Sequence, residues 1–93
     1  MDFEWHDQKA RRNLTKHRVT FDVATTVFGD AFAIASPDLP HSGDEQRWLI
    51  VGLASNARLL TVCYVERSEA IRIINAREAT RSERLTYDRG RRR

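Results

Sequence analysis

The chain has 93 residues, which is enough for one hydrophobic core and too few for two independent ones. With 41% hydrophobic and 31% charged residues, its composition excludes an intrinsically disordered chain. Fourteen of the sixteen basic residues are arginine, whose planar guanidinium suits bidentate contact with phosphate or carboxylate. The net charge of +3 alone fits nucleic acid, an acidic protein or an anionic membrane surface, and the predominance of arginine favours a phosphate-bearing or carboxylate-rich partner.

The first half of the chain predicts a strand, two helices and a second strand. The strand is "DFEW", and Asp7 is a plausible N-cap for a helix running to about His17. Thr20 can cap a second, short helix whose apolar stripe comprises Phe21, Ala24, Val27 and Phe28. "AFAIAS" reads as the next strand, and "PDLPHSGDE" after it is the longest turn-rich loop of the chain.

The second half predicts three more strands and a final helix. "QRWLIVGLA" and "RLLTVCYVE" form a hairpin around Ser55 and Asn56, and "AIRIINA" is the last strand. Helical composition follows over residues 78–89. We expect an α+β fold of order β-α-α-β-β-β-β-α, in which helices cover one face of a small antiparallel sheet. Residues 1–89 would form the single domain, and residues 90–93 a solvated basic tail.

Several classes of function lack a signal. Cys63 is the only cysteine and lies in an apolar strand, so we expect a buried thiol. The three histidines are scattered without metal-ligand spacing, so we expect no metal and no cofactor. No apolar run approaches the length of a signal peptide or a membrane span, which favours a cytoplasmic location without a membrane partner.

Three blocks of the sequence resemble a known family. "FEWHDQKARRNLTKHRVTFDVATTVFGD", "PDLPHSGDEQRWLIVGL" and "RIINAREATRSERLTY" are similar, in order and spacing, to the BrnT toxins of bacterial type II toxin–antitoxin pairs. The chain departs from the family pattern at His6 and Asp7, where the family has Asp-Pro. It also departs at Arg18, where the family has glycine, and at Asn75, which is usually serine.

The resemblance implies a RelE-like ribonuclease fold and metal-independent RNA cleavage. It also implies a BrnA-like antitoxin that neutralises the toxin in a hetero-oligomer, and operator DNA that is bound only through that antitoxin complex.

Metal-free RNA cleavage requires proton transfer and stabilisation of phosphate charge, for which the matching positions offer candidate catalytic residues. His17 can exchange a proton near neutral pH, but its helix face also carries Ala10 and Leu14, so it could equally pack in the core. Arg72 alternates with Ile71 and Ile73 in a strand, and Arg77 follows near the strand end. Both arginines could contact phosphate, or could pair with a glutamate such as Glu83 or Glu45.

The loop after the second strand supplies two further catalytic candidates, Glu45 and Arg47. At i and i+2 on a strand they would share one face, either as a base and a cation or as a local ion pair. For RNA binding we select Lys9, Lys16, His41, Arg81 and Tyr87, although Tyr87 could instead pack the last helix onto the sheet.

Two functional classes fit these residues. The first is an endoribonuclease toxin that cleaves RNA through attack of the 2′-hydroxyl and is neutralised by an antitoxin. The second is a non-catalytic module whose arginines bind an acidic partner or contribute to an operator-binding complex.

Overall fold

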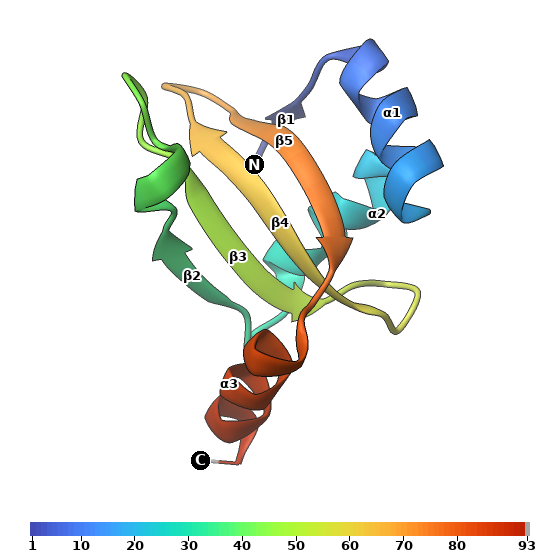
Figure 1. Cartoon of the computed structure of the whole chain (residues 1–93), viewed down its shortest axis with the longest axis vertical. Helices are drawn as coiled ribbons and strands as arrows, with labels where there is room; N and C mark the ends of the chain where they lie inside the picture. Colours follow the sequence, from blue (N-terminus) through green and yellow to red (C-terminus); the bar gives the residue numbers. More distant parts are fainter. Residues whose placement is uncertain (93) are drawn as a thin grey trace.

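The computed structural model describes residues 1–92 and contains the eight predicted elements in the predicted order (Figure 1). The strands are β1 (Phe3–Glu4), β2 (Ile34–Pro37), β3 (Trp48–Leu53), β4 (Leu59–Glu66) and β5 (Ile71–Glu78). The helices are α1 (Asp7–His17), α2 (Phe21–Thr25) and α3 (Arg81–Arg91), with the 3-10 turns η1 (Thr26–Gly29) and η2 (Leu39–His41). The predicted α+β class is confirmed.

The five strands form one sheet in the order β1-β5-β4-β3-β2. Strands β2 to β5 pair antiparallel along the chain, as predicted. β1 pairs parallel with β5, so the expectation of a purely antiparallel sheet is wrong at this edge. The β4–β5 register shifts between Cys63, which pairs with Asn75, and Tyr64, which pairs with Ile73. Ile74 is therefore an extra residue in β5, and such a bulge bends the strand locally.

The hydrophobic core lies between one face of the sheet and the first two helices. Leu60, Val62 and Tyr64 of β4 belong to the core cluster together with Phe21 and Ala24 of α2. Thr61 and Cys63 alternate with them and point to the opposite face, which we call the outer face. Both are also buried, at 1% and 3% exposure, so the predicted buried thiol is confirmed.

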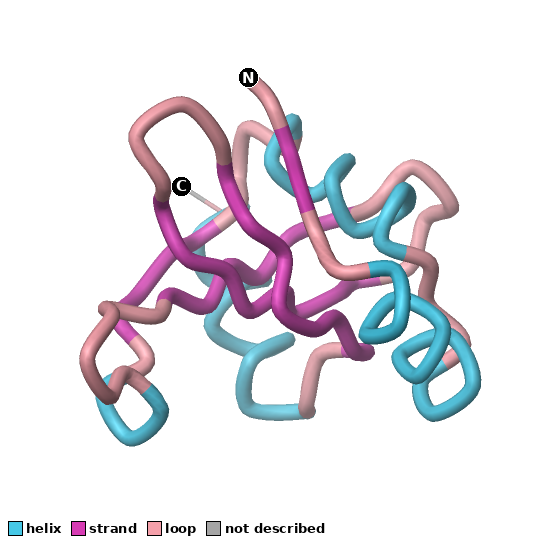
Figure 2. The backbone as a smooth tube through the Cα atoms, turned by 90° about the horizontal axis from the view of Figure 1, so that it is seen from above, coloured by secondary structure: helices cyan, strands magenta, loops and turns pink. Residues whose placement is uncertain are grey.

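The helices lie on both faces of the sheet, so the prediction of one covered face is wrong. Glu83 in the first turn of α3 accepts a hydrogen bond from Thr61 Oγ1, which belongs to the outer face. Figure 2 looks down on the molecule and shows the strands as a layer with helices on either side. α3 thus covers one end of the outer face and leaves the rest of it to loops and solvent.

The N-terminal end of α1 differs from the prediction, whereas its predicted end at His17 is confirmed. Its N-cap is His6, and Asp7 is the first helical residue, where its negative charge favours the helix N-terminus. Its C-cap is Arg18, which adopts the left-handed conformation at φ 58°. That conformation is the one glycine reaches at least cost, and the family has glycine at this position. The predicted cap of α2 is confirmed, because Thr20 Oγ1 accepts a hydrogen bond from Val23 N.

α3 is placed later than its composition suggested. Glu78 belongs to β5, and the helix starts at Arg81 behind a capping box formed by Thr80 and Glu83. The helix continues through Gly90 to Arg91, so the first two residues of the predicted tail are helical, and Arg93 lies outside the described residues. The side chain of Tyr87 anchors α3, since its hydroxyl donates to Oδ2 of Asp30 at 2.6 Å.

Candidate functional site

A cleft of about 500 Å³ lies between α1 and β5, and we call it the basic cleft. It is lined by Lys9, Arg12, Asn13, Lys16, His17, Ile74, Asn75 and Arg77. Lys9, Arg12 and Lys16 follow one another at i, i+3 and i+7, which places them along one face of α1. No aspartate or glutamate is among the lining residues, so the cleft presents positive charge and hydrogen-bond donors.

One buried side chain holds the two walls of the basic cleft together. Asn13 Nδ2 donates to the backbone oxygens of Val19 and Ala76 at 3.0 and 2.8 Å, and its Oδ1 accepts from Ala76 N at 3.0 Å. The side chain is 6% exposed, and three hydrogen bonds in such a setting fix α1 against β5. The bulge at Ile74 lies two positions before Ala76, and Asn75 between them is exposed and lines the cleft.

His17 stands at the end of this cleft. It is half-buried, and within residues 1–92 its ring forms no hydrogen bond of the kind expected for a packed core histidine. The neighbouring Leu14 is 45% exposed, so this part of the helix face is not the core. The environment of His17 is thus not that of a packed core residue, and its role in proton transfer stays a prediction.

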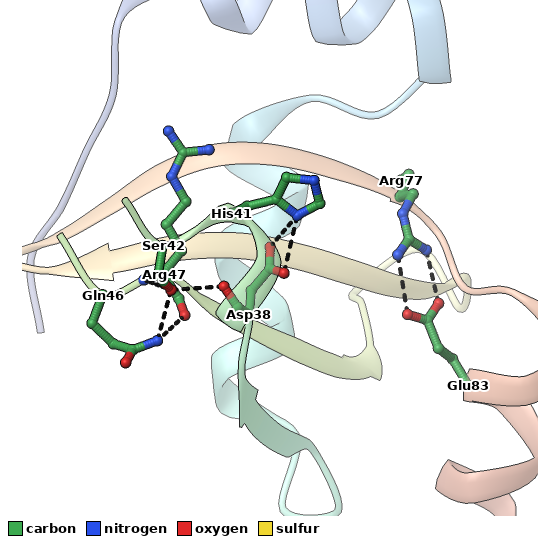
Figure 3. Close-up of polar contacts among 7 residues, drawn as sticks. All are labelled: Asp38, His41, Ser42, Gln46, Arg47, Arg77 and Glu83. Carbon is green, nitrogen blue, oxygen red and sulfur yellow. Dashed lines mark hydrogen bonds and ion pairs between the residues drawn. The ribbon is translucent and has the colours of Figure 1, made fainter. Parts of the chain in front are cut away.

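Arg77 closes the other side of the cleft and is held by Glu83 (Figure 3). Its two terminal nitrogens donate to the two carboxylate oxygens of Glu83 at 2.7 and 3.0 Å. Glu83 Oε1 also accepts from Thr61 Oγ1 and Thr80 N, each at 2.8 Å. The hydrogen bonds from Arg77 lower the pKa of Glu83 to about 2, and the same contact raises the pKa of Arg77. The guanidinium is thus fixed in place and permanently charged.

A second group of polar side chains lies on the outer face, in the loop between β2 and β3. Nδ1 of His41 lies 3.0 and 3.1 Å from the carboxylate oxygens of Asp38, and Figure 3 shows this pair between Arg47 and Arg77. Burial raises the pKa of the Cys63 thiol beneath them, and the nearby charges of Arg47, Asp38 and Arg77 modify it. Cys63 therefore lies near the centre of this group.

Other predicted site residues lie elsewhere. Glu45 precedes β3 and sits in a loop, where it pairs with Arg67 at 3.3 Å. It does not share a strand face with Arg47, so that interpretation is wrong because β3 starts only at Trp48. Arg72 is on the predicted face of β5, but Nε donates to Glu4 Oε2 at 2.6 Å, and Glu4 is not a partner that the sequence pointed to.

The RNA-binding candidates divide in the same way. Lys9 and Lys16 line the basic cleft, and His41 lies on the outer face. Arg81 is exposed at the start of α3 and lies outside the cleft. Tyr87 is only 2% exposed and its hydroxyl is bonded to Asp30, so the packing alternative holds and its ring is not available to stack on a base.

The sequence interpretation missed the roles of Asp38, Asn75 and Asn13. Asp38 precedes His41 by three residues in a turn-rich loop, a spacing that brings two side chains together in a single helical turn. Asn75 and Asn13 carried no such local signal, because their contacts join segments far apart in the chain. In residues 1–92 no three histidine, cysteine, aspartate or glutamate side chains gather where they could hold a metal ion. Over the same range no helix has the length and apolarity needed to cross a membrane.

Comparison with known proteins finds a family and a similar solved structure. A family model described as "Ribonuclease toxin, BrnT, of type II toxin-antitoxin system" matches residues 5–83. The crystal structure of the Brucella abortus ribonuclease toxin BrnT is similar in fold, with a TM-score of 0.67 and 23% sequence identity. The similarity covers 87% of this chain and 99% of the Brucella chain. No curated protein matches the sequence.

Proposed function

Because the chain belongs to the BrnT family of ribonuclease toxins of type II toxin–antitoxin systems, we propose that it is an endoribonuclease that needs no metal ion. The observation that carries this proposal is the basic cleft, in which Lys9, Lys16 and Arg77 surround a space that could hold the backbone of RNA. Cations that converge on a concave surface attract phosphate and supply most of the affinity for nucleic acid.

The proposed reaction is attack of a ribose 2′-oxygen on the adjacent phosphorus. The 2′-hydroxyl loses its proton to a base, the P–O5′ bond breaks, and the leaving 5′-oxygen takes up a proton. The products end in a 2′,3′-cyclic phosphate and a 5′-hydroxyl. His17 is a proton-transfer candidate at the cleft. The guanidinium of Arg77, held by Glu83, and that of Arg47 on the outer face would stabilise negative charge on the phosphate.

Cleavage by the purified chain, free of any antitoxin, tests the reaction. We expect RNA to be degraded in the presence of EDTA and the products to carry 2′,3′-cyclic phosphates. Activity that disappears with the chelator and returns with magnesium would contradict metal independence. Uniform 5′-phosphate and 3′-hydroxyl ends would contradict 2′-hydroxyl attack.

A pair of double variants tests the cleft. Lys9→Ala with Lys16→Ala removes two positive charges from the cleft, whereas Arg11→Ala with Arg84→Ala removes two exposed charges outside its lining. The first pair should lower RNA affinity and reduce the dependence of log affinity on log salt concentration by about 2. The control pair should change both much less. Equal losses in the two double variants would show that net charge, and not the cleft, binds RNA.

As a toxin of this family the chain has an antitoxin partner, and we propose a BrnA-like protein that forms a hetero-oligomer with it in the cytoplasm. An acidic segment of the antitoxin would cover the basic cleft, and operator DNA would be bound through the antitoxin. Expression of the chain alone should arrest bacterial growth, and co-expression of the cognate antitoxin should restore it. Normal growth on abundant folded toxin would favour a non-catalytic interaction module.

A further inference from the structure

The loop between β2 and β3 holds an exposed histidine against a buried carboxylate. The two oxygens of Asp38 lie 3.0 and 3.1 Å from Nδ1 of His41. The Asp38 side chain is 10% exposed and that of His41 is 70% exposed. This arrangement presents the imidazole to solvent while its anchor stays inside the protein.

The contacts of the Asp38 carboxylate indicate more than a structural role. Asp38 is the N-cap residue of η2, yet its side chain makes no capping hydrogen bond. Among the described residues, the ring of His41 is the one donor that this carboxylate has. A carboxylate is costly to bury unless it is hydrogen-bonded. Holding His41 is therefore the function of Asp38 that the geometry supports.

The pair fixes which ring nitrogen can exchange a proton. An ionised carboxylate only accepts hydrogen bonds, so Nδ1 of His41 carries the hydrogen between the two residues. Nε2 is then the free atom, and in Figure 3 it lies on the side of the ring turned away from Asp38. An orienting carboxylate, an imidazole and a free second nitrogen are the parts that activate a hydroxyl nucleophile in other enzymes.

The backbone around the pair is braced by Ser42. Its Oγ donates to Asp38 O at 2.7 Å and accepts from Arg47 N at 3.0 Å. Asp38 N in turn donates to Arg47 O at 2.8 Å. These bonds tie both ends of the loop together, so the imidazole is carried on a defined backbone.

The charged groups near the pair come from three further elements. Arg47 precedes β3, Arg77 belongs to β5, and Glu83 of α3 holds Arg77. Cys63 of β4 lies beneath them and is buried. Arg77 also lines the basic cleft, and its guanidinium, hydrogen-bonded to Glu83, is close enough to Asp38 for that carboxylate charge also to raise the pKa of Arg77. A phosphate bound at Arg77 would therefore lie on the side of the sheet that carries this pair.

We propose that His41 is the general base of the RNA cleavage and that Asp38 is its positioning residue. The inference rests on the proposed function and adds the group that starts the reaction. Nε2 takes the proton of the 2′-hydroxyl, the 2′-oxygen forms its bond to phosphorus, and the P–O5′ bond breaks. The 5′-oxygen receives a proton from a second donor, which leaves the cyclic phosphate and an imidazolium at His41 that returns its proton to solvent.

Single-turnover cleavage by His41→Gln tests the base. The exposed side chain can be replaced without disturbing the core, and His6→Gln is the matched control at another exposed histidine. His41→Gln should cleave about 100- to 10,000-fold more slowly while RNA affinity changes little. His6→Gln should cleave at the wild-type rate. A rate for His41→Gln within threefold of wild type overturns the proposal.

A substrate with a 5′-thio leaving group separates base from acid, because sulfur leaves without a proton. The defect of His41→Gln should persist on this substrate, since the 2′-hydroxyl still needs a base. Restoration of the wild-type rate would make His41 the general acid and overturn the assignment. A wild-type chain that forms no cyclic phosphate would contradict the proposed function itself. Normal cleavage by both the wild type and His41→Gln would contradict only the assignment of His41 as the base.

Asp38→Asn tests the positioning role, with Asp44→Asn as the control that removes one charge from the same loop. The asparagine amide would favour the other tautomer of His41, so the rate should fall at least tenfold and its pH dependence on the acidic side should change. Rates are taken per folded molecule, with the fold checked by thermal unfolding. An unchanged pH profile in folded Asp38→Asn would show that the contact only braces the loop.

Discussion

Replacing Glu83 by glutamine should remove a large part of the acid-sensitive stability of the fold. The pKa of Glu83 lies at about 2, against an ordinary value of 4.5, mainly because of the hydrogen bonds from Arg77. At about 1.4 kcal/mol for each pKa unit, the difference between these two values corresponds to about 3 to 4 kcal/mol of stability. Because the pKa is lower in the folded state, this stability is complete above pH 4.5 and is lost as the pH falls through 2.

Glutamine keeps the shape of the side chain and can still accept one hydrogen bond, so at pH 7 we expect a loss of about 2 kcal/mol and about 10 °C in Tm. The assay is urea unfolding followed by circular dichroism between pH 7 and pH 2. Between pH 4.5 and 2 the wild-type chain should lose more stability than Glu83→Gln, because the variant lacks the titrating group. Glu69→Gln, at an exposed position in the β4–β5 turn, should follow the wild-type curve. Parallel curves for wild type and Glu83→Gln would refute the reasoning.

Three further substitutions test other parts of the structure. Asn13→Ala leaves the backbone polar groups of Ala76 buried without their partner, so the free energy of unfolding measured in urea should fall by about 3 kcal/mol. A loss below about 1 kcal/mol would be inconsistent with the contact. Arg18→Gly relieves a left-handed residue, and calorimetry should show a gain of about 0.5 kcal/mol; a loss would mean that the arginine side chain compensates. Arg72→Lys keeps the positive charge beside Glu4, whose side chain is 40% exposed. The cleavage rate should therefore stay within about threefold of wild type and the free energy of unfolding within about 1 kcal/mol. A single-turnover rate about tenfold below wild type would instead mean that Arg72 contacts the phosphate.

The element order was predictable because its signals are local. The Thr20 cap, the turn at residues 55–56 and the alternation along β4 depend on residues a few positions apart. The parallel pairing of β1 with β5 had no such signal, since two residues of β1 meet a strand nearly 70 positions later. The position of β1 depends on long-range packing, and the local hydrophobic pattern of the sequence carries no information about that packing.

The sequence predicts the types of residue at the site better than it predicts their contacts. Lys9, Lys16, His17 and Arg77 were chosen for their chemistry, and the fold brings them to one cleft. The prediction that Glu45 and Arg47 share a strand face is wrong because β3 starts only at Trp48. Both residues belong to the preceding loop, in which Arg47 N donates a hydrogen bond to Ser42 Oγ. The predicted pairing of Glu83 with an arginine is confirmed, and that arginine is Arg77.

The contact of Asn13 with Ala76, 63 positions later, also sets the point during synthesis at which the basic cleft can form. The lysines of α1 leave the exit tunnel while β5 has not been translated, so a nascent chain has one wall of the cleft and no Arg77. Domains complete their folding once the last interacting segment has emerged. The cleft is therefore complete only after β5 has been synthesised, so an antitoxin that is already present can bind the toxin as soon as it folds.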